Sequence, residues 1–159
     1  MSTLSERVLV NCPLAQAAPR IVAFFRAHGN REGDTAQLML RAAGLERSVI
    51  ATMQARHLAA DMAPRYRVQW APEEPGPYPL FAGELVVEGA DDYDVFWLVL
   101  EGRYEPPLGT LGKAFDAVAG RHIAASTAID LLVRIKKEIE KLYTLDESAK
   151  PPDPAAPGP

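Results

Sequence analysis

The stretch from Trp97 to Tyr143, WLVLEGRYEPPLGTLGKAFDAVAGRHIAASTAIDLLVRIKKEIEKLY, joins two different apolar patterns across a corner of proline and glycine. Before the corner, the residues from Asp94 to Tyr104 are mostly aliphatic, β-branched and aromatic, which is typical of a strand covered on both faces. Pro106 and Pro107 end this strand because proline has no N–H to donate. After Thr110 the apolar residues recur at helical spacing. The stretch therefore predicts a buried strand followed by one long helix.

The predicted helix covers Thr110 to Tyr143 and is apolar along one side. Its residues at alternating spacings of four and three are Leu111, Phe115, Val118, His122, Ala125, Ile129 and Leu132, and a neighbouring stripe continues through Leu131, Ile135, Ile139 and Leu142. Gly120 interrupts the helix at a cost of about 1 kcal/mol relative to alanine, so we expect a bend or a close backbone contact there. A helix with one apolar stripe must lie on another element, and we expect it to cross a curved antiparallel sheet.

The preceding segments supply the strands of that sheet. Periodicity and turn residues predict strands at Arg7–Cys12, Ser48–His57, Arg65–Ala71 and Leu80–Gly89, and helices at Leu14–His28 and Thr35–Ala43. Gly29 stands where the first of these helices should end. The segments Leu58–Pro64 and Pro72–Pro79 are predicted as turn and loop, and Leu80–Gly89 should form a hairpin with the strand that follows it. The predicted fold class is α+β.

The bulk composition limits the organisation and the partners of the chain. Its 159 residues favour one domain, assigned to residues 1–143, while five prolines from Pro151 to Pro159 predict a disordered tail over residues 144–159. A net charge of -4 disfavours nucleic acid as a partner. Cys12 is the only cysteine, which excludes an internal disulfide and a cysteine-based zinc site and fits a cytoplasmic location. No signal peptide or membrane-spanning stretch is recognisable, so stable membrane insertion is not expected.

Three motifs together carry a resemblance to a known family. They are LFAGEL from Leu80 to Leu85, GRYEPPLG from Gly102 to Gly109, and GRHIA from Gly120 to Ala124. With the order of the predicted elements, the chain from Arg7 to Tyr143 resembles the START-like, or SRPBCC, superfamily, in a bacterial subgroup.

The resemblance implies a helix-grip fold. In that fold a curved antiparallel sheet wraps around a long C-terminal helix, two short helices follow the first strand, and an apolar cavity lies between sheet and helix. Members of the superfamily bind lipids, sterols, polyketides or other hydrophobic molecules, and some catalyse cyclisation or dehydration. They share no catalytic motif, so none is transferred to this chain.

The candidate ligand-binding residues combine aromatic and polar side chains: Tyr66, Trp70, Phe81, Glu84, Trp97, Tyr104, Phe115 and His122. The aromatic side chains suit an ordinary core equally well, above all Trp97. For His122 a core histidine bonded to a strand is favoured over a group facing a ligand. Charges within predicted strands, namely Arg56, Glu84, Glu101 and Arg103, more often lie on a solvent face than inside a cavity. Glu84 is the best candidate for an internal position.

Three functions remain open from the sequence. The leading hypothesis is a protein without enzymatic activity that binds or transfers a hydrophobic small molecule. The second is an enzyme like polyketide cyclases or dehydratases, with His122 and Glu84 as acid and base. The third is a protein-interaction module that uses the helix end and the tail. No phosphate loop or metal-ligand spacing is present, so no cofactor or metal is expected. The sequence leaves the oligomeric state open, a homodimer included.

Overall fold

The computed structural model describes residues 2–29, 35–41, 48–56, 65–72, 80–105 and 117–152. Within them, six antiparallel strands form one sheet in the order β1-β6-β5-β4-β3-β2. The elements are β1 (Ser2–Val10), the short 3-10 helix η1 (Leu14–Gln16), α1 (Ala17–His28), β2 (Thr35–Arg41), β3 (Ser48–Arg56), β4 (Arg65–Pro72), β5 (Leu80–Gly89), β6 (Phe96–Glu105) and α2 (Ala117–Ala149). The predicted α+β class is confirmed, and so is the hairpin of β5 and β6.

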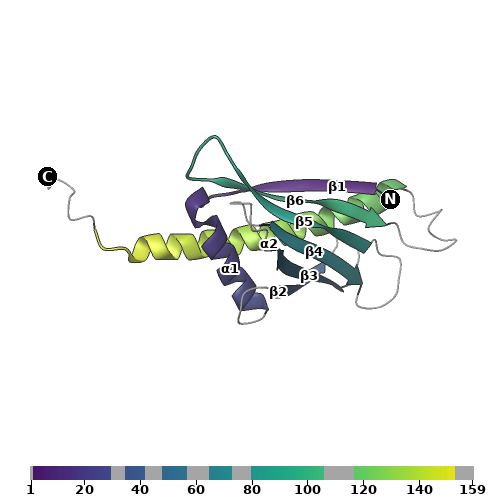
Figure 1. Ribbon diagram of the computed structural model, residues 1–159, viewed down its shortest axis with the longest axis horizontal. Helices are drawn as coiled ribbons and strands as arrows, with labels where there is room; N and C mark the ends of the chain where they lie inside the picture. Colours follow the sequence, from purple (N-terminus) through teal and green to yellow (C-terminus); the bar gives the residue numbers. More distant parts are fainter. Residues whose placement is uncertain are drawn as a thin grey trace.

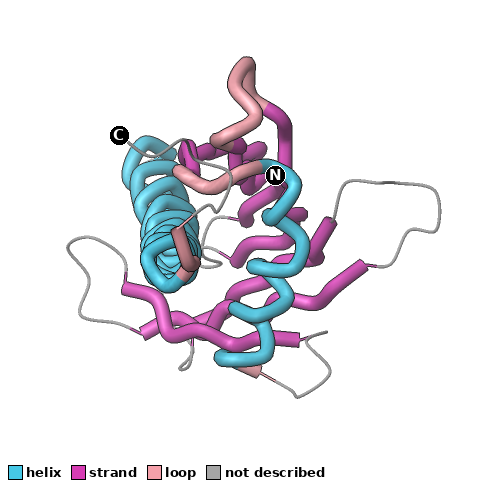
Figure 2. Tube along the Cα trace, turned by 90° about the vertical axis from the view of Figure 1, so that its left-hand side faces the viewer, coloured by secondary structure: helices cyan, strands magenta, loops and turns pink. Residues whose placement is uncertain are grey.

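The long helix α2 lies in the curve of the sheet (Figure 1 and Figure 2). It packs against β1 and β6 at one side of the sheet and against β2 at the other edge. Lys136 of α2 donates a hydrogen bond to the carbonyl oxygen of Leu9, with 2.8 Å between Nζ and O, so the edge strand β1 is partly covered. The helix α1 packs on β2 and on α2. This arrangement confirms the predicted helix-grip architecture.

Strand pairing divides the sheet into an inner face toward the helices and an outer face. Leu85 of β5 lies opposite Tyr66 of β4 and Leu100 of β6, and all three are buried in the core that includes α1 and α2. The next residue of β5, Glu84, lies opposite Arg67 and Glu101 and belongs to the outer face. Side chains alternate between the faces because the strand period is two, so the register assigns a face to every strand residue.

The buried side of α2 is not the side that the sequence predicted over its first turns. Its buried residues are Gly120, Ile123, Ala124, Thr127, Ala128, Leu131, Leu132, Ile135 and Ile139. His122 is exposed and Ile129 is 43% exposed, although both were assigned to the apolar stripe. At about 100° per residue, His122 lies roughly 160° around the helix from Ala124. Over these turns the buried side of the helix consists mostly of small residues, namely Gly120, Ala124, Thr127 and Ala128.

The second predicted helix, Thr35–Ala43, is wrong because this segment forms β2. Ala36 and Leu38 are buried and pair with Met53 and Ala51 of β3, while Gln37 between them is exposed. The alanine, glutamine, leucine and methionine of this segment favour a helix by intrinsic propensity. Pairing with β3 and burial of every second side chain outweigh that preference.

Gly29 ends α1 as predicted, but it does so in an extended conformation, with φ −154° and ψ −133°. It forms an isolated bridge with Ala36, at the start of β2. A Cβ at Gly29 would overlap the backbone of Thr35 and lie 2.8 Å from the Cα of Ala36. Glycine is therefore required at this position for the chain to approach β2.

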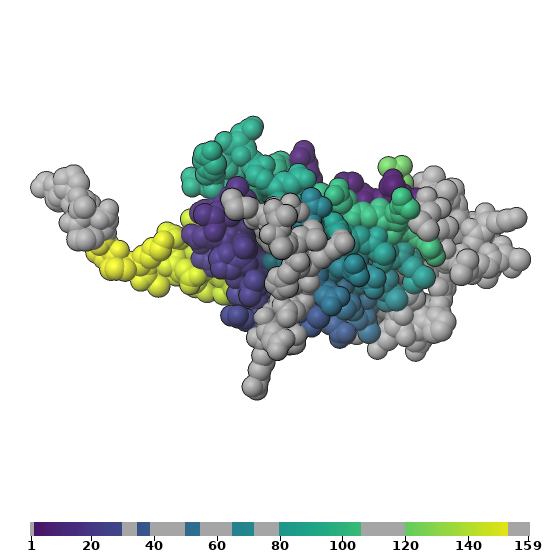
Figure 3. All heavy atoms as spheres, viewed as in Figure 1, coloured from purple at the N-terminus to yellow at the C-terminus, as the bar shows by residue number. Residues whose placement is uncertain are grey.

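The C-terminal end of α2 extends further than predicted. Residues 144–149, assigned to a disordered tail, are helical and exposed, and Leu145 is 56% exposed. Figure 3 shows this part of α2, in yellow, standing out from the body beyond α1. The interaction-module hypothesis for the helix end stays a prediction. Among the described residues, no helix has the length and apolar character needed to span a bilayer.

Several sequence predictions fall on residues outside the described ranges. They are the turn at 58–64, most of the loop at 72–79, the corner and helix start at 106–116, and the end of the tail at 153–159. At Gly120, no described atom lies within 4 Å of the position its Cβ would take, so the expected bend or close backbone contact stays a prediction.

Candidate ligand-binding site

Four of the predicted ligand-binding residues come together on the inner face. Trp70 of β4, Phe81 of β5 and Tyr104 of β6 form one row across neighbouring strands, and Tyr66 lies four residues before Trp70. Their exposed fractions are between 2% and 5%. The ring of Trp70 stacks on that of Phe81 with 4.1 Å between centroids and an angle of 16° between planes. We call these four residues the inner aromatic cluster.

A pair of glycines makes room for the ring of Phe81. Gly83 and Gly102 lie opposite each other in β5 and β6. A Cβ would lie 2.6 Å from Cζ of Phe81 if it were added to Gly83, and 2.9 Å from the same atom if it were added to Gly102. The ring therefore lies directly over both glycines, where any larger residue would displace it. The sequence motifs contained both glycines but did not reveal this role.

The helix α1 closes one side of the cluster through a residue that sequence reasoning did not select. Phe25 stacks on Tyr66 with 4.7 Å between ring centroids and 26° between planes. Phe24 contacts Phe25 edge to face at 6.2 Å. The spacing of Ile21, Phe24 and Phe25 marks the buried side of α1 and could have identified Phe25, but only the fold places it beside Tyr66.

The polar groups of the inner face are hydroxyl groups and the indole N–H. Burial raises the pKa of Tyr66 to about 12, so its side chain is a neutral phenol at physiological pH. Thr127 of α2 is fully buried and donates a hydrogen bond to the carbonyl oxygen of Ile123 at 2.8 Å. Within the described part of the chain, no group of three or more His, Cys, Asp or Glu side chains is arranged to hold a metal ion.

Two predicted site residues of the strands lie on the outer face instead. Glu84 pairs with Arg65 there, with 3.5 Å between Oε2 and Nη1, and this contradicts its proposed position inside a cavity. Trp97 lies below the guanidinium of Arg7, which is 4.0 Å from its ring centroid. Glu101 and Arg103 are exposed, as the solvent-face interpretation predicted. The register explains this result, because it places all these residues on the face of the sheet that lies opposite to the face of Phe81 and Leu85.

His122 does not contribute to the inner face. It is exposed on α2, so neither the core histidine nor the ligand-facing histidine of the prediction is found. The sheet and the core separate its side of α2 from the outer-face residue Glu84. The two side chains therefore cannot act together on one ligand as acid and base. Phe115 lies outside the described residues.

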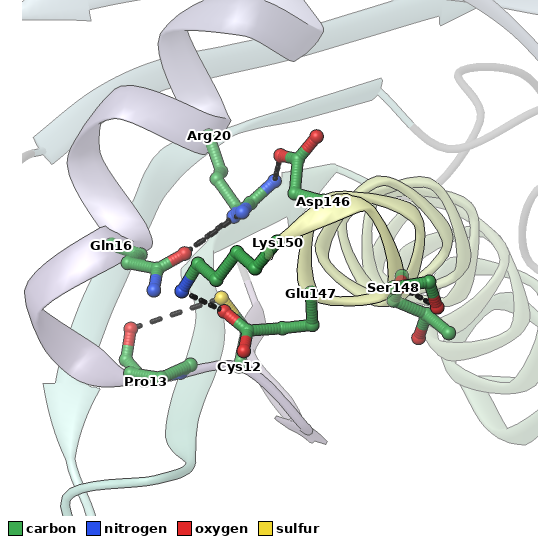
Figure 4. A network of polar contacts seen from close by, with 9 residues as sticks. Cys12, Pro13, Gln16, Arg20, Asp146, Glu147, Ser148 and Lys150 are labelled. Atoms are coloured by element: carbon green, nitrogen blue, oxygen red, sulfur yellow. Dashed lines mark hydrogen bonds and ion pairs between the residues drawn. The ribbon is translucent and has the colours of Figure 1, made fainter. Parts of the chain in front are cut away.

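A polar junction joins the C-terminal part of α2 to η1 and α1, and Figure 4 shows its contacts around Arg20. Arg20 donates hydrogen bonds to Asp146 at 2.8 Å and to Gln16 at 3.0 and 2.8 Å. Nε2 of His28 lies 2.7 Å from a carboxylate oxygen of Glu138. Burial raises the pKa of the nearby Cys12 thiol, although the charge of Arg20 opposes this effect. Where the buried apolar residues of α2 end, these polar contacts join the charged helix to α1.

Comparison with known proteins supports the fold and not a particular activity. No family model matches the chain, and no curated protein matches it in sequence. Among solved structures, a conserved protein from Geobacillus kaustophilus matches with a TM-score of 0.57 and 14% identity over 88% of this chain and 96% of the other. The Zhui aromatase/cyclase from Streptomyces sp. R1128 matches with a TM-score of 0.55 and 14% identity over 88% and 94%. A START superfamily protein from Mycobacterium smegmatis also matches, with a TM-score of 0.46 and 13% identity over 90% and 97%.

The fold that the resemblance implied is found, and two solved structures with TM-scores above 0.5 share it. The first two structures align with this chain over 96% and 94% of their own length. At 14% identity the likeness does not transfer a ligand or a reaction. The function must therefore be argued from the residues of this chain.

Proposed function

We propose that this protein binds an apolar small molecule between the inner face of the sheet and α2. The inner aromatic cluster supplies the apolar surface, and Phe25 of α1 stacks on one of its rings. Binding sites for small molecules are typically lined by aromatic and aliphatic side chains with a few polar groups. An aromatase/cyclase of the same fold is compatible with such a ligand, although its reaction is not assigned to this chain.

The observation that carries the proposal is the space beside Gly120. This residue is buried, and its position on the helix aligns with Ala124 and Leu131, which face the core. Even so, no described atom lies within 4 Å of the position of a Cβ at Gly120. A position in a well-packed core would have several such neighbours. Within the described part of the chain, nothing fills the space beside this turn of α2, and we assign that space to the ligand.

A space-filling variant tests the proposal. Gly120→Leu places an isobutyl group in the free space, and we expect it to lower the affinity for the fluorescent probe 1-aminoanthracene at least about tenfold. Its melting temperature should stay the same or rise, because leucine has a better helix propensity than glycine. His122→Leu adds an apolar group to the exposed side of the same helix turn and should leave binding unchanged.

Two results would contradict the proposal. If Gly120→Leu is folded and binds the probe as tightly as the wild type, the ligand does not lie beside this turn of α2. If wild-type protein binds neither 1-aminoanthracene nor any member of a lipophile panel, and native mass spectrometry finds no retained molecule, the chain is not a carrier. A strongly lowered melting temperature of Gly120→Leu would show that the space is already filled.

A further inference from the structure

We infer that the hydroxyl group of Tyr66 anchors the ligand by donating a hydrogen bond to an uncharged acceptor such as a carbonyl oxygen. This inference rests on the proposed function and names the chemical class of the ligand: an apolar molecule that carries a carbonyl or ether oxygen. It excludes plain hydrocarbons and ions as preferred ligands.

The first support is the state of the hydroxyl. Tyr66 is 4% exposed, and no hydrogen bond joins its hydroxyl to another described residue. The Tyr66 oxygen is also not among the fully buried, unpaired side-chain atoms of the described residues, so it keeps some accessible surface. A phenol oxygen that reaches open space can donate a hydrogen bond to a ligand there. Tyr104, also on the inner face, is 5% exposed and has the same standing.

The second support is the orientation of Tyr66. Its ring is fixed by stacking on Phe25 at 4.7 Å, and its neighbour across the strands is the fully buried Leu85. Side chains of a strand stand roughly perpendicular to the sheet. The hydroxyl, at the end of the ring, is therefore held away from β4 and toward the interior between sheet and helices. A donor fixed in this way loses little conformational entropy when a ligand binds.

The third support concerns charge. Burial alone raises the pKa of Tyr66 to about 12, with no contribution from a neighbouring charged group. The phenol therefore stays protonated and acts as a donor at every physiological pH. Since no charged neighbour of the hydroxyl is found among the described residues, an ion bound at this place would lack a counterion from them, and burying an unpaired charge is very costly. An uncharged acceptor fits this surrounding best.

A matched pair of probes tests the inference. The probe 2-acetylnaphthalene carries a carbonyl oxygen, and 2-ethylnaphthalene has nearly the same shape without it. We expect wild-type protein to bind the first more tightly than the second. Tyr66→Phe should lower the affinity for 2-acetylnaphthalene about fivefold, the range of one neutral hydrogen bond. Its affinity for 2-ethylnaphthalene should stay within about twofold of the wild-type value.

Stability gives an independent readout of the same variant. The ligand-free Tyr66→Phe protein should melt at the same temperature as the wild type or higher, because the hydroxyl has no described partner to lose. Tyr93→Phe is the matched control, since Tyr93 is 83% exposed in the β5–β6 turn and should affect neither probe.

The outcomes separate the inference from the proposed function. If both probes bind and Tyr66→Phe weakens them equally or not at all, the inference is wrong while the binding function stands. If the melting temperature of ligand-free Tyr66→Phe falls by several degrees, the hydroxyl is already bonded, and the inference is also wrong. If neither probe binds the wild type, the proposed function fails for this class and the inference fails with it.

Discussion

Glu140 of α2 accepts a hydrogen bond from the backbone N–H of Asn11, with 2.9 Å between Oε1 and N, across 129 residues of sequence. The same carboxylate pairs with Lys136, which also donates to the carbonyl oxygen of Leu9. One side chain of α2 thus joins the end of β1 to the helix. This link holds α2 in place at the side of the sheet where the helix makes most of its contacts.

This carboxylate should make the stability of the protein depend on pH in the acidic range. Burial raises the pKa of Glu140, but the bonds from Lys136 and Asn11 outweigh it, and the pKa lies below the ordinary value of 4.5. A group with a lowered pKa in the folded state stabilises the fold above its unfolded pKa, and this contribution is lost as pH falls through the folded pKa. The contribution of Glu140 should therefore be complete above about pH 5 and decline below pH 4.5.

Urea unfolding of Glu140→Gln checks this dependence. At pH 7 the variant should be less stable than the wild type by about 1 kcal/mol, and the difference should shrink as pH falls below 4.5. Glu88→Gln, an exposed residue of the outer face, is the control and should show no such convergence. A stability difference that is the same at pH 3 and pH 7 would contradict the assignment.

Gly102→Ala should destabilise the protein by about 2 kcal/mol or more. The added Cβ would overlap the backbone carbonyl of Ala82 and would lie 2.5 Å from the Cα of Gly83 and 2.9 Å from the ring of Phe81. The backbone atoms cannot move without disturbing the pairing of β5 with β6. Denaturant unfolding measures the effect, and a stability equal to that of the wild type would show that the strands are further apart than described.

Gly120→Ala should have the opposite effect and stabilise the protein by about 1 kcal/mol. The position is helical, and no described atom lies within 4 Å of the new Cβ. Alanine therefore gains its helix propensity without a steric penalty. The same unfolding experiment serves as measurement, and the two glycine variants act as controls for each other, because a general effect of adding a methyl group would have the same sign in both.

The two tryptophans should report differently on a ligand. Trp70 is 2% exposed within the inner aromatic cluster, whereas Trp97 lies on the outer face beside Arg7. In Trp97→Phe, the remaining emission from Trp70 should be blue-shifted, resistant to acrylamide and changed by 1-aminoanthracene. In Trp70→Phe, the emission from Trp97 should be quenched readily by acrylamide and should not respond to the probe. Equal responses of both tryptophans would place the ligand elsewhere.

Much of the fold follows from local patterns in the sequence. The alternation of Tyr66, Val68 and Trp70 predicts β4 and its buried side, and both are found. The apolar run of β6 predicts a covered strand, and Phe96, Leu98, Val99 and Leu100 are buried. Such patterns are reliable because a period of two or 3.6 residues acts within the segment itself. The candidate site is harder to predict from the sequence. Of the residues predicted for it, the structure brings together only the aromatic side chains of β4, β5 and β6.

The errors have a common cause. Thr35–Arg41 has the composition of a helix but forms an edge strand because β3 provides partners for its backbone. His122 and Glu84 each stand beside apolar residues in the sequence, yet they lie on the exposed side of α2 and on the outer face of the sheet. Which side of an element is buried depends on what packs against it, and that partner is far away in the sequence.

The sequence alone determined the class of the fold, most of its strands and its long final helix, because alternation and helical spacing are properties of short segments. Tertiary structure decided the rest: the edge strand β2, the stacking of Phe25 on Tyr66 and the glycines beneath Phe81. These features depend on distances between residues that are remote along the chain. Contacts of this kind arise only when sheet and helices pack together, since no local pattern encodes how closely two elements approach.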